Sequence, residues 1–495
     1  MSPLALFSVV LAYFALLLGV AWRTSRHADN ASFFIGNKNS NWMLVAFGMV
    51  GTTLSGVTFI SVPGAVGRDG FGYLQIVLGY TLGYVAVAFV LLPLYYRLGL
   101  TSIYHYLDVR LGRRAYQSGA AFFILSRTLG ATARLYLVVA ILQATILERL
   151  GVPFWATSMV ILLMILLYTY EGGVKTIVWT DTLQTTGMLL GLVVCVLWLL
   201  QRLDLGLLES LARMRESGLA RVLTWDVDSP TYFWKQVAAG MAITIAMTGM
   251  DQEMMQKNIS VSTVGNAQKN MVALTVILAG VLALFLFLGG LLHLYAAAAG
   301  LSGAAATGDK LFPAVVMGHM PAAIQLIFFI ALVSALFPSA DGAITALTSS
   351  FCIDILGLQR RAGLDERART RLRHRVHLGF CALFLALVMV FKWIDSASMI
   401  GVILKLAGYT YGPLLGLFAF GILTRRAVRD RWVPLAVLAG PLLCWLVDRH
   451  QGWLFGSYQL GLELLIVNGL LVMGGLWLIS APAGAGRAVP AAPAS

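Results

Sequence analysis

The sequence predicts an all-α membrane protein with about 13 transmembrane helices. Hydrophobic residues make up 59% of its 495 residues and charged residues only 12%, whereas a soluble domain carries about a quarter charged residues. Apolar runs long enough to cross a bilayer recur along the chain. The expected spans are residues 3–23, 42–66, 71–96, 116–147, 153–169, 177–200, 231–254, 268–298, 322–356, 376–392, 396–423, 432–447 and 459–480.

The first apolar run is expected to stay as a helix. It has no basic segment before it, and it is as long as a membrane span, unlike the shorter apolar core of a cleaved signal peptide. The polar segments between spans are too short for an independent soluble domain. Residues 1–480 are therefore expected to form a single transmembrane transporter domain, followed by a disordered cytoplasmic tail, 481–495, of sequence APAGAGRAVPAAPAS.

The distribution of arginine and lysine predicts the orientation in the membrane. Arginine-rich loops alternate along the chain with loops that carry single basic residues, and basic loops usually face the cytoplasm. The N-terminus is then outside and the C-terminus cytoplasmic, in an integral, multi-pass protein of the plasma (inner) membrane. The net charge of +13 lies in these loops, so it indicates membrane orientation and no nucleic-acid partner.

The second span contains the unusual stretch GTTLSGVTFISVPG, Gly51–Gly64. Glycine, hydroxyl residues and proline weaken a helix, and unpaired backbone groups are costly in hydrocarbon. A break here would expose carbonyl oxygens, which are hard ligands suited to Na⁺. The alternative is a flexible helix whose small residues permit close packing.

A second such stretch, GMAITIAMTGMDQ (Gly240–Gln252), follows five spans later. Transporters built from inverted repeats carry one discontinuous helix in each repeat. The repeats would cover about residues 42–200 and 231–423. Two further motifs are expected to be structural: MDQEMMQK, at the inner gate, and GYTYGPLLG, where helices pack closely.

Six stretches occur in an order that resembles the sodium:solute symporter family, which includes the sodium–sugar, sodium–proline and sialic acid symporters. They are FFIGNKNSNW, TTLSGVTFISVPG, LPLYYRLGLTSIYHYL, EGGVKTIVWTDTLQ, ALFPSADGAITALTSSFCIDIL and YTYGPLLGLFAFGILTRR. The resemblance covers about residues 5–430. It implies a LeuT-like inverted-repeat core of five plus five helices, with one leading and two trailing helices.

The resemblance also implies a sodium site between the second and ninth spans. Its ligands would be the carbonyl oxygens of Gly51, Leu54 and Ala335 and the hydroxyl of Ser339, with Na⁺ as the coupling ion. Many family members have another hydroxyl residue where this chain has Pro338. The alternative for Ser339 is a hydrogen bond to its own helix.

Two acidic residues are expected within the membrane, Asp181 and Asp341. An intramembrane carboxylate needs a partner or a cavity. The family resemblance implies that Asp181 lies on the sodium exit route, where Asp341 could join it in a second cation site. The alternatives are a helix-capping role for Asp181 and an ion pair between Asp341 and Lys405 or Arg127.

The solute is expected beside the first break. Ser55 and Thr58 resemble the pair that meets a carboxylate in sialic acid symporters. The further candidates are Thr53, Gln75, Arg127, Arg134 and Gln252. An arginine could hold an anion with two hydrogen bonds or could be a structural pin. At other positions, where sodium–sugar symporters bind their substrate, this chain has apolar residues. A glucose-type sugar is therefore not expected as the solute.

The sequence thus predicts a sodium-coupled secondary active symporter that imports a small polar or anionic organic solute by alternating access. A proton-coupled transporter that uses Asp181 or Asp341, and a solute-sensing membrane protein of the same fold, are the alternatives. No enzyme activity is expected, because no nucleophile, base or HExxH motif is clustered. The partners are the solute, sodium and the lipid bilayer; the oligomeric state stays open.

Overall fold

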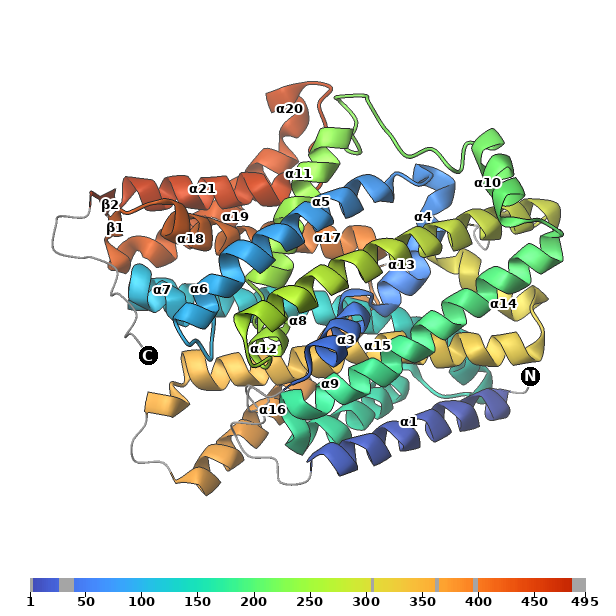
Figure 1. The fold of residues 1–495 in the computed structure, drawn as a ribbon, viewed down its shortest axis with the longest axis horizontal. Coiled ribbons are helices and arrows are strands. Elements are labelled where there is room, and N and C mark those ends of the chain that lie inside the picture. Colours follow the sequence, from blue (N-terminus) through green and yellow to red (C-terminus); the bar gives the residue numbers. More distant parts are fainter. Residues whose placement is uncertain (1–2, 26–39, 304–306, 361–364, 395–398, 483–495) are drawn as a thin grey trace.

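The computed structural model describes residues 3–25, 40–303, 307–360, 365–394 and 399–482. These residues form a bundle of long helices with one small antiparallel sheet, in which β1 (Ala427–Val428) pairs with β2 (Ser480–Ala481). In Figure 1 most long helices run side by side, with α1 (Pro3–Ser25) along one edge and the red α19 (Val433–Arg449) and α21 (Leu464–Leu478) along the opposite edge. The predicted tail, 481–495, lies almost wholly outside the described residues.

Seven helices of the described chain are long and apolar enough to cross a membrane, or up to nine if two bent pairs each count as one span. Three shorter apolar helices lie at Ser8–Arg23, Phe154–Tyr170 and Leu464–Leu478. The prediction of a multi-pass helical membrane protein is confirmed. The number of 13 spans and the five-plus-five arrangement stay predictions.

The helices of the first half include each of the expected runs. They are α3 (Trp42–Thr53), α4 (Gly56–Asp69), α5 (Tyr73–Ala86), η2 (Val87–Leu91), α6 (Leu92–Arg97), α7 (His105–Arg110), α8 (Arg113–Leu142), η3 (Gln143–Leu147), η4 (Glu148–Leu150), α9 (Phe154–Leu203) and α10 (Leu207–Glu216). The runs expected at 153–169 and 177–200 both lie in α9.

The second half begins after a long connection. Its elements are α11 (Phe233–Thr244), η5 (Ile245–Gly249), α12 (Gln252–Ile259), α13 (Val264–Ala298), η7 (Gly308–Lys310), α14 (Leu311–His319), α15 (Ala322–Ser350), η8 (Phe351–Ile355), η9 (Leu358–Arg360), α16 (Glu366–Phe391), α17 (Met399–Thr410), α18 (Gly412–Leu423), η10 (Asp430–Trp432) and α20 (Gln451–Phe455), besides α19 and α21.

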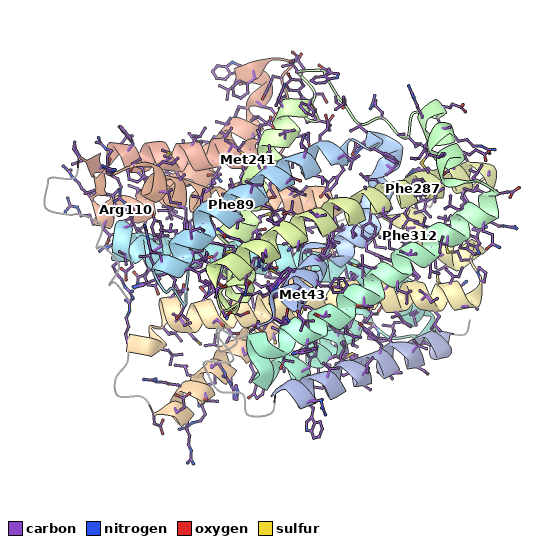
Figure 2. All side chains as sticks on the ribbon, in the orientation of Figure 1. Met43, Phe89, Arg110, Met241, Phe287 and Phe312 are labelled. Atoms are coloured by element: carbon purple, nitrogen blue, oxygen red, sulfur yellow. The ribbon has the colours of Figure 1, made fainter. Side chains whose placement is uncertain are left out.

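The outer surface of the bundle carries apolar side chains. Met43, Phe89 and Met241, labelled in Figure 2, are 58%, 56% and 38% exposed, while Phe312 is fully buried. Helices with apolar outer faces suit a hydrocarbon surround, because all their backbone groups are paired internally.

The first predicted break exists between α3 and α4, whose axes differ by 56°. Leu54 has φ −88° and ψ 79°, outside the helical range, and Ser55 begins the next helix in an extended conformation. α3 packs closely on α9, since a β-carbon on Gly51 would lie 2.2 Å from the Thr185 hydroxyl oxygen. The helix is therefore both interrupted and tightly packed through small residues.

The second predicted break exists as well. α11 passes through a π-helical turn, η5, and the chain leaves the helix at Met250 and Asp251 before α12 begins. A third break separates α17 from α18, with an angle of 45°. Here Gly412 and Gly416 lie against α21, with no room for a β-carbon, which agrees with the packing role expected for GYTYGPLLG.

Candidate substrate and cation site

A cavity of about 110 Å³ lies beside the first break, large enough for several waters or a small solute. Residues on both sides of the break line it, from Thr52 to Thr58 except the glycine, together with side chains of α5, α8, α11 and α13. Five of the predicted substrate residues lie on its wall: Thr53, Ser55, Thr58, Arg127 and Arg134. The structure thus brings together the hydroxyl pair and both arginines.

The two arginines on α8 differ in their surroundings. Arg127 is only 4% exposed and donates to the Glu253 carboxylate, with Asp251 at 4.0 Å. Arg134 is half-buried, and it makes no hydrogen bond or salt bridge with any residue in the described part of the chain. Arg127 is a structural ion-pair partner at the cavity wall, whereas Arg134 presents unused donors to the cavity.

The two predicted glutamines lie away from the cavity lining. Gln75 accepts a hydrogen bond from the Thr224 backbone amide and donates to the carbonyls of Gly72 and Thr231. Gln252 accepts from the Ile103 amide and donates to the Thr101 carbonyl. Both amide groups join neighbouring segments of backbone.

The predicted sodium ligands lie where α15 meets the first break. A β-carbon on Gly56 would lie 3.7 Å from the Ala335 carbonyl oxygen, so the break and this part of α15 are adjacent. Ser339 is 1% exposed, and its hydroxyl has no hydrogen-bond partner among the residues that the structure describes. The alternative of a hydrogen bond to its own helix is therefore wrong. A buried hydroxyl without a partner among the described residues, one helical turn after Ala335, fits an oxygen-coordinated cation.

Pro338 lies within α15, one residue before Ser339. Proline cannot donate to the carbonyl four residues earlier, that of Ser334. The Ser334 hydroxyl itself points elsewhere and donates to the Tyr13 hydroxyl of α1 at 2.8 Å. The carbonyl of Ser334 therefore lacks the donor that a helix usually supplies four residues later.

Asp181 is fully buried within α9, so the alternative of a helix cap is wrong. Its Oδ2 atom lies 2.7 Å from the ammonium of Lys257 and accepts a hydrogen bond from Thr52 at 3.1 Å. Lys257 also donates to Thr52 at 2.7 Å and lies 3.5 Å from Glu253. Three segments meet here: α3 just before its break, α9 and α12.

Asp341 has no ion pair with Lys405 or Arg127, and that alternative is wrong. Lys405 pairs with Asp448 at 3.0 Å, and Arg127 pairs with Glu253. Asp341 instead accepts hydrogen bonds from the Tyr168 hydroxyl at 2.7 Å and the Gly342 amide at 2.5 Å. It is close enough to Asp181 and Lys257 to interact with them electrostatically.

These contacts form one buried charged cluster below the cavity. Its carboxylates are Asp181, Asp251, Glu253 and Asp341, and its cations are Arg127 and Lys257. The four acids outnumber these cations, and they still do so when Arg134, which interacts electrostatically with Asp251 and Glu253, is counted as a third. Buried charges are costly unless paired, so the cluster favours the uptake of a cation or protons.

The sequence analysis missed the roles of Lys257 and Glu253. Both lie in MDQEMMQK, where their spacing of four residues places them on one helix face. A lysine and two acids so close to a predicted break could have indicated buried ion pairs at this place. The partner of Lys257, Asp181, is 76 residues away in the chain, so no local pattern indicated it.

Comparison with known proteins shows which proteins this chain is similar to. The family model described as the sodium:solute symporter family matches residues 33–430. The human sodium/iodide cotransporter is 29% identical over 261 residues, which cover 52% of this chain and 40% of that protein. Sodium-coupled monocarboxylate transporter 2 of Danio rerio is 26% identical over 408 residues, which cover 80% of this chain and 63% of that protein.

The chain therefore spans less than two thirds of the length of these curated relatives. Among solved structures, a substrate-bound, outward-open Na⁺-coupled sialic acid symporter has a TM-score of 0.82 at 18% identity, with 97% of this chain and 99% of that chain covered. Mhp1, a nucleobase-cation-symport-1 family transporter, has a TM-score of 0.56 at 12% identity, with 91% and 94% covered. At these identities the structures show a shared fold.

Proposed function

Because the chain belongs to the sodium:solute symporter family, we propose that it is a sodium-coupled secondary active symporter for a small organic anion. The observation that carries this proposal is that two polar groups near the first break have no hydrogen-bond partner among the described residues. Within the described part of the chain, the Arg134 guanidinium at the cavity wall and the Ser339 hydroxyl beside the predicted ion position have no hydrogen-bond partner.

The cavity chemistry supports an anionic solute. The acids nearest Arg134, namely Asp251 and Glu253, are already bonded to Tyr411 and Arg127. A guanidinium with free donors binds a carboxylate through two parallel hydrogen bonds, and Ser55 and Thr58 would complete the contacts. The relatives named for iodide and for monocarboxylates, both anionic, agree with this choice.

Sodium would supply the driving force. Bound by the carbonyls of Gly51, Leu54 and Ala335 and by Ser339, the ion would hold the broken helix in a conformation that binds the solute. Movement of one positive charge through the membrane potential releases about 2.3 kcal/mol per 100 mV. Rocking of one helix set against the other would then expose both sites to the opposite side.

The finer architecture belongs to the same proposal. We expect 13 spans, a single transporter domain over 1–480 and inverted repeats over about 42–200 and 231–423. Discontinuous helices at the first and second breaks support the repeats. The N-terminus would be outside and the C-terminus cytoplasmic, which places MDQEMMQK at the inner gate.

Proton coupling is the rival proposal. The uncompensated acids of the charged cluster could take up protons in place of Na⁺. This rival favours Asp341 over Asp181, since Asp181 is already paired with Lys257. The two proposals differ in whether the unpartnered Ser339 hydroxyl matters, because a proton relay does not need that ligand.

The test is uptake of small monocarboxylates, beginning with acetate and lactate, into liposomes that contain the full chain. Uptake should require Na⁺, with K⁺ or choline inactive as replacements, and Ser339→Ala should weaken the activation by Na⁺. Because this hydroxyl has no partner to lose, the variant should fold as well as the wild type. Uptake driven by a pH gradient without Na⁺, or unchanged Na⁺ activation in Ser339→Ala, contradicts sodium coupling at this site.

A further inference from the structure

Lys257 places a positive charge at the position where the sequence predicted a second cation site. Its ammonium lies 2.7 Å from Asp181 Oδ2, 2.7 Å from Thr52 Oγ1 and 3.5 Å from Glu253 Oε1. The side chain is only 3% exposed. An ammonium carries one charge and has three donors, and three oxygen atoms surround this one.

The backbone around Lys257 holds its side chain in this position. Asp251 caps the start of α12 by accepting from the amides of Glu253 and Met254. On the opposite side, a β-carbon on Gly342 would lie 2.4 Å from Glu253 Oε1 and 3.3 Å from the Lys257 ammonium. A larger residue at Gly342 in α15 would therefore displace the ends of the Glu253 and Lys257 side chains.

The other predicted ligand of a second cation is occupied too. Both oxygens of Asp341 accept hydrogen bonds, one from Tyr168 and one from the Gly342 amide. A metal ion at Asp181 would therefore gain few free oxygens and would meet the charge of Lys257. Like charges at close range in a buried site repel strongly.

We propose that Lys257 is a tethered cation that fills the second cation position at Asp181, so that the transporter binds one sodium ion per cycle. This inference rests on the proposed function, which places that one ion at Ser339. Lys257 thereby determines the ion stoichiometry, and it holds α12 to α3 and α9 without being carried across the membrane.

Removal of Lys257 should open the second position. The Oδ1 atom of Asp181 has no hydrogen-bond partner among the described residues, and both Oδ2 and the Thr52 hydroxyl would lose their contact with the ammonium. The two oxygens of the Asp181 carboxylate and the Thr52 hydroxyl would then face the space that the ammonium had filled, with the negative charge of Asp341 nearby. Hard oxygen ligands with a net negative charge favour a small cation.

The test is saturation binding of ²²Na⁺ to the purified full chain, which needs no solute. The wild type should bind one Na⁺ per chain without cooperativity. Lys257→Met should bind two, and its Hill coefficient should rise above one. The matched control Lys257→Arg keeps the tethered charge and should bind one.

Loss of one partner of a buried ion pair is strongly destabilising. A second variant is therefore included in case Lys257→Met does not fold. Asp181→Asn combined with Lys257→Met removes both charges and should bind one Na⁺, as the wild type does. Two ions on the wild type, one ion on folded Lys257→Met, or lost binding in the double variant overturns the inference. Failure of the proposed function looks different: no Na⁺ binding by the wild type, or wild-type binding by Ser339→Ala.

Discussion

The backbone and side-chain groups at the two helix breaks are bonded in opposite ways. At the second break, Tyr95 and Tyr104 donate to the carbonyls of Gly249 and Met250, at 2.8 and 2.9 Å. Asp251 caps the following helix and accepts from Tyr411 at 2.8 Å. At the first break, Ser55 begins its helix without a side-chain cap.

This difference separates a structural break from one that is available to ligands. A break whose backbone groups are all bonded to side chains is stable in either the presence or the absence of a solute. A break that leaves carbonyls, hydroxyls and a guanidinium unused favours bound partners from outside the chain. Substitutions at the second break should therefore lower stability, whereas substitutions at the first break should change binding.

The largest effect is expected for Glu253→Gln, beside the second break. It keeps the shape of the side chain but removes the charge that pairs with Arg127, so the free energy of unfolding should fall by about 3–5 kcal/mol. Thermal unfolding in detergent measures this loss. Glu209→Gln is the control, because its pair with Arg213 is exposed and is expected to contribute about 0.2–1 kcal/mol. Equal, small shifts in both variants would contradict the role of the cluster.

Arg134→Ala, at the first break, should weaken solute binding with little loss of stability. Loss of hydrogen bonds to a charged group costs about 1.5–3 kcal/mol, which is about a tenfold to hundredfold higher half-saturation concentration. Uptake of acetate or lactate measures it. Arg134→Lys keeps the charge without the forked donors, so its half-saturation concentration should lie between those of the wild type and Arg134→Ala. A normal half-saturation in Arg134→Ala would exclude this arginine from the solute site.

Tyr104→Phe tests how firmly the second break is held. The change removes the donor to the Met250 carbonyl, and the free energy of unfolding should fall by about 1 kcal/mol. Na⁺ half-saturation should stay the same, since the break takes no part in ion binding. The comparison variant is Tyr232→Phe, whose hydroxyl has no hydrogen bond to the residues described. A change in Na⁺ affinity without loss of stability would assign the second break to the ion site.

Pro338→Ser is expected to have an effect as small as that of Tyr104→Phe, on Na⁺ binding and not on stability. An added hydroxyl next to Ser339 should strengthen Na⁺ binding by about 1 kcal/mol, or about fivefold. Measurement of Na⁺-dependent thermal stabilisation gives the change. Pro441→Ser makes the same substitution inside α19, far along the chain from the site, and should leave Na⁺ binding unchanged. Weaker Na⁺ binding in Pro338→Ser would indicate that the site depends on the carbonyl that proline leaves free.

Local patterns predicted a large part of the first break. Glycine, hydroxyl residues and proline within an apolar run indicated where the helix would stop, because these residues weaken a helix wherever it lies. The resemblance to sialic acid symporters indicated Ser55 and Thr58, and the arginines within a span indicated Arg134; all three line one cavity. They did not separate Arg134 from Arg127, since both occupy one face of one helix and differ only in the partners they meet.

The charged cluster could not be predicted in the same way. Asp181 and Lys257 are joined at 2.7 Å, although separate helices carry them. An acid in a membrane span indicates only that some partner or ion is needed, and each nearby cation in the folded state is a candidate. Three-dimensional packing of α3, α9 and α12 selects the partner, and with it the number of positions left for sodium.

The amino-acid sequence alone determined the class of the molecule: a multi-pass helical membrane protein, interrupted at two places, in the sodium:solute symporter family. Hydropathy, helix-weakening residues and ordered motifs are local properties, so they can be seen without the fold. The tertiary structure decided which polar groups are used and which are free. That distinction depends on distances between helices far apart in the chain, because a buried charge is neutralised by whatever lies within reach of it.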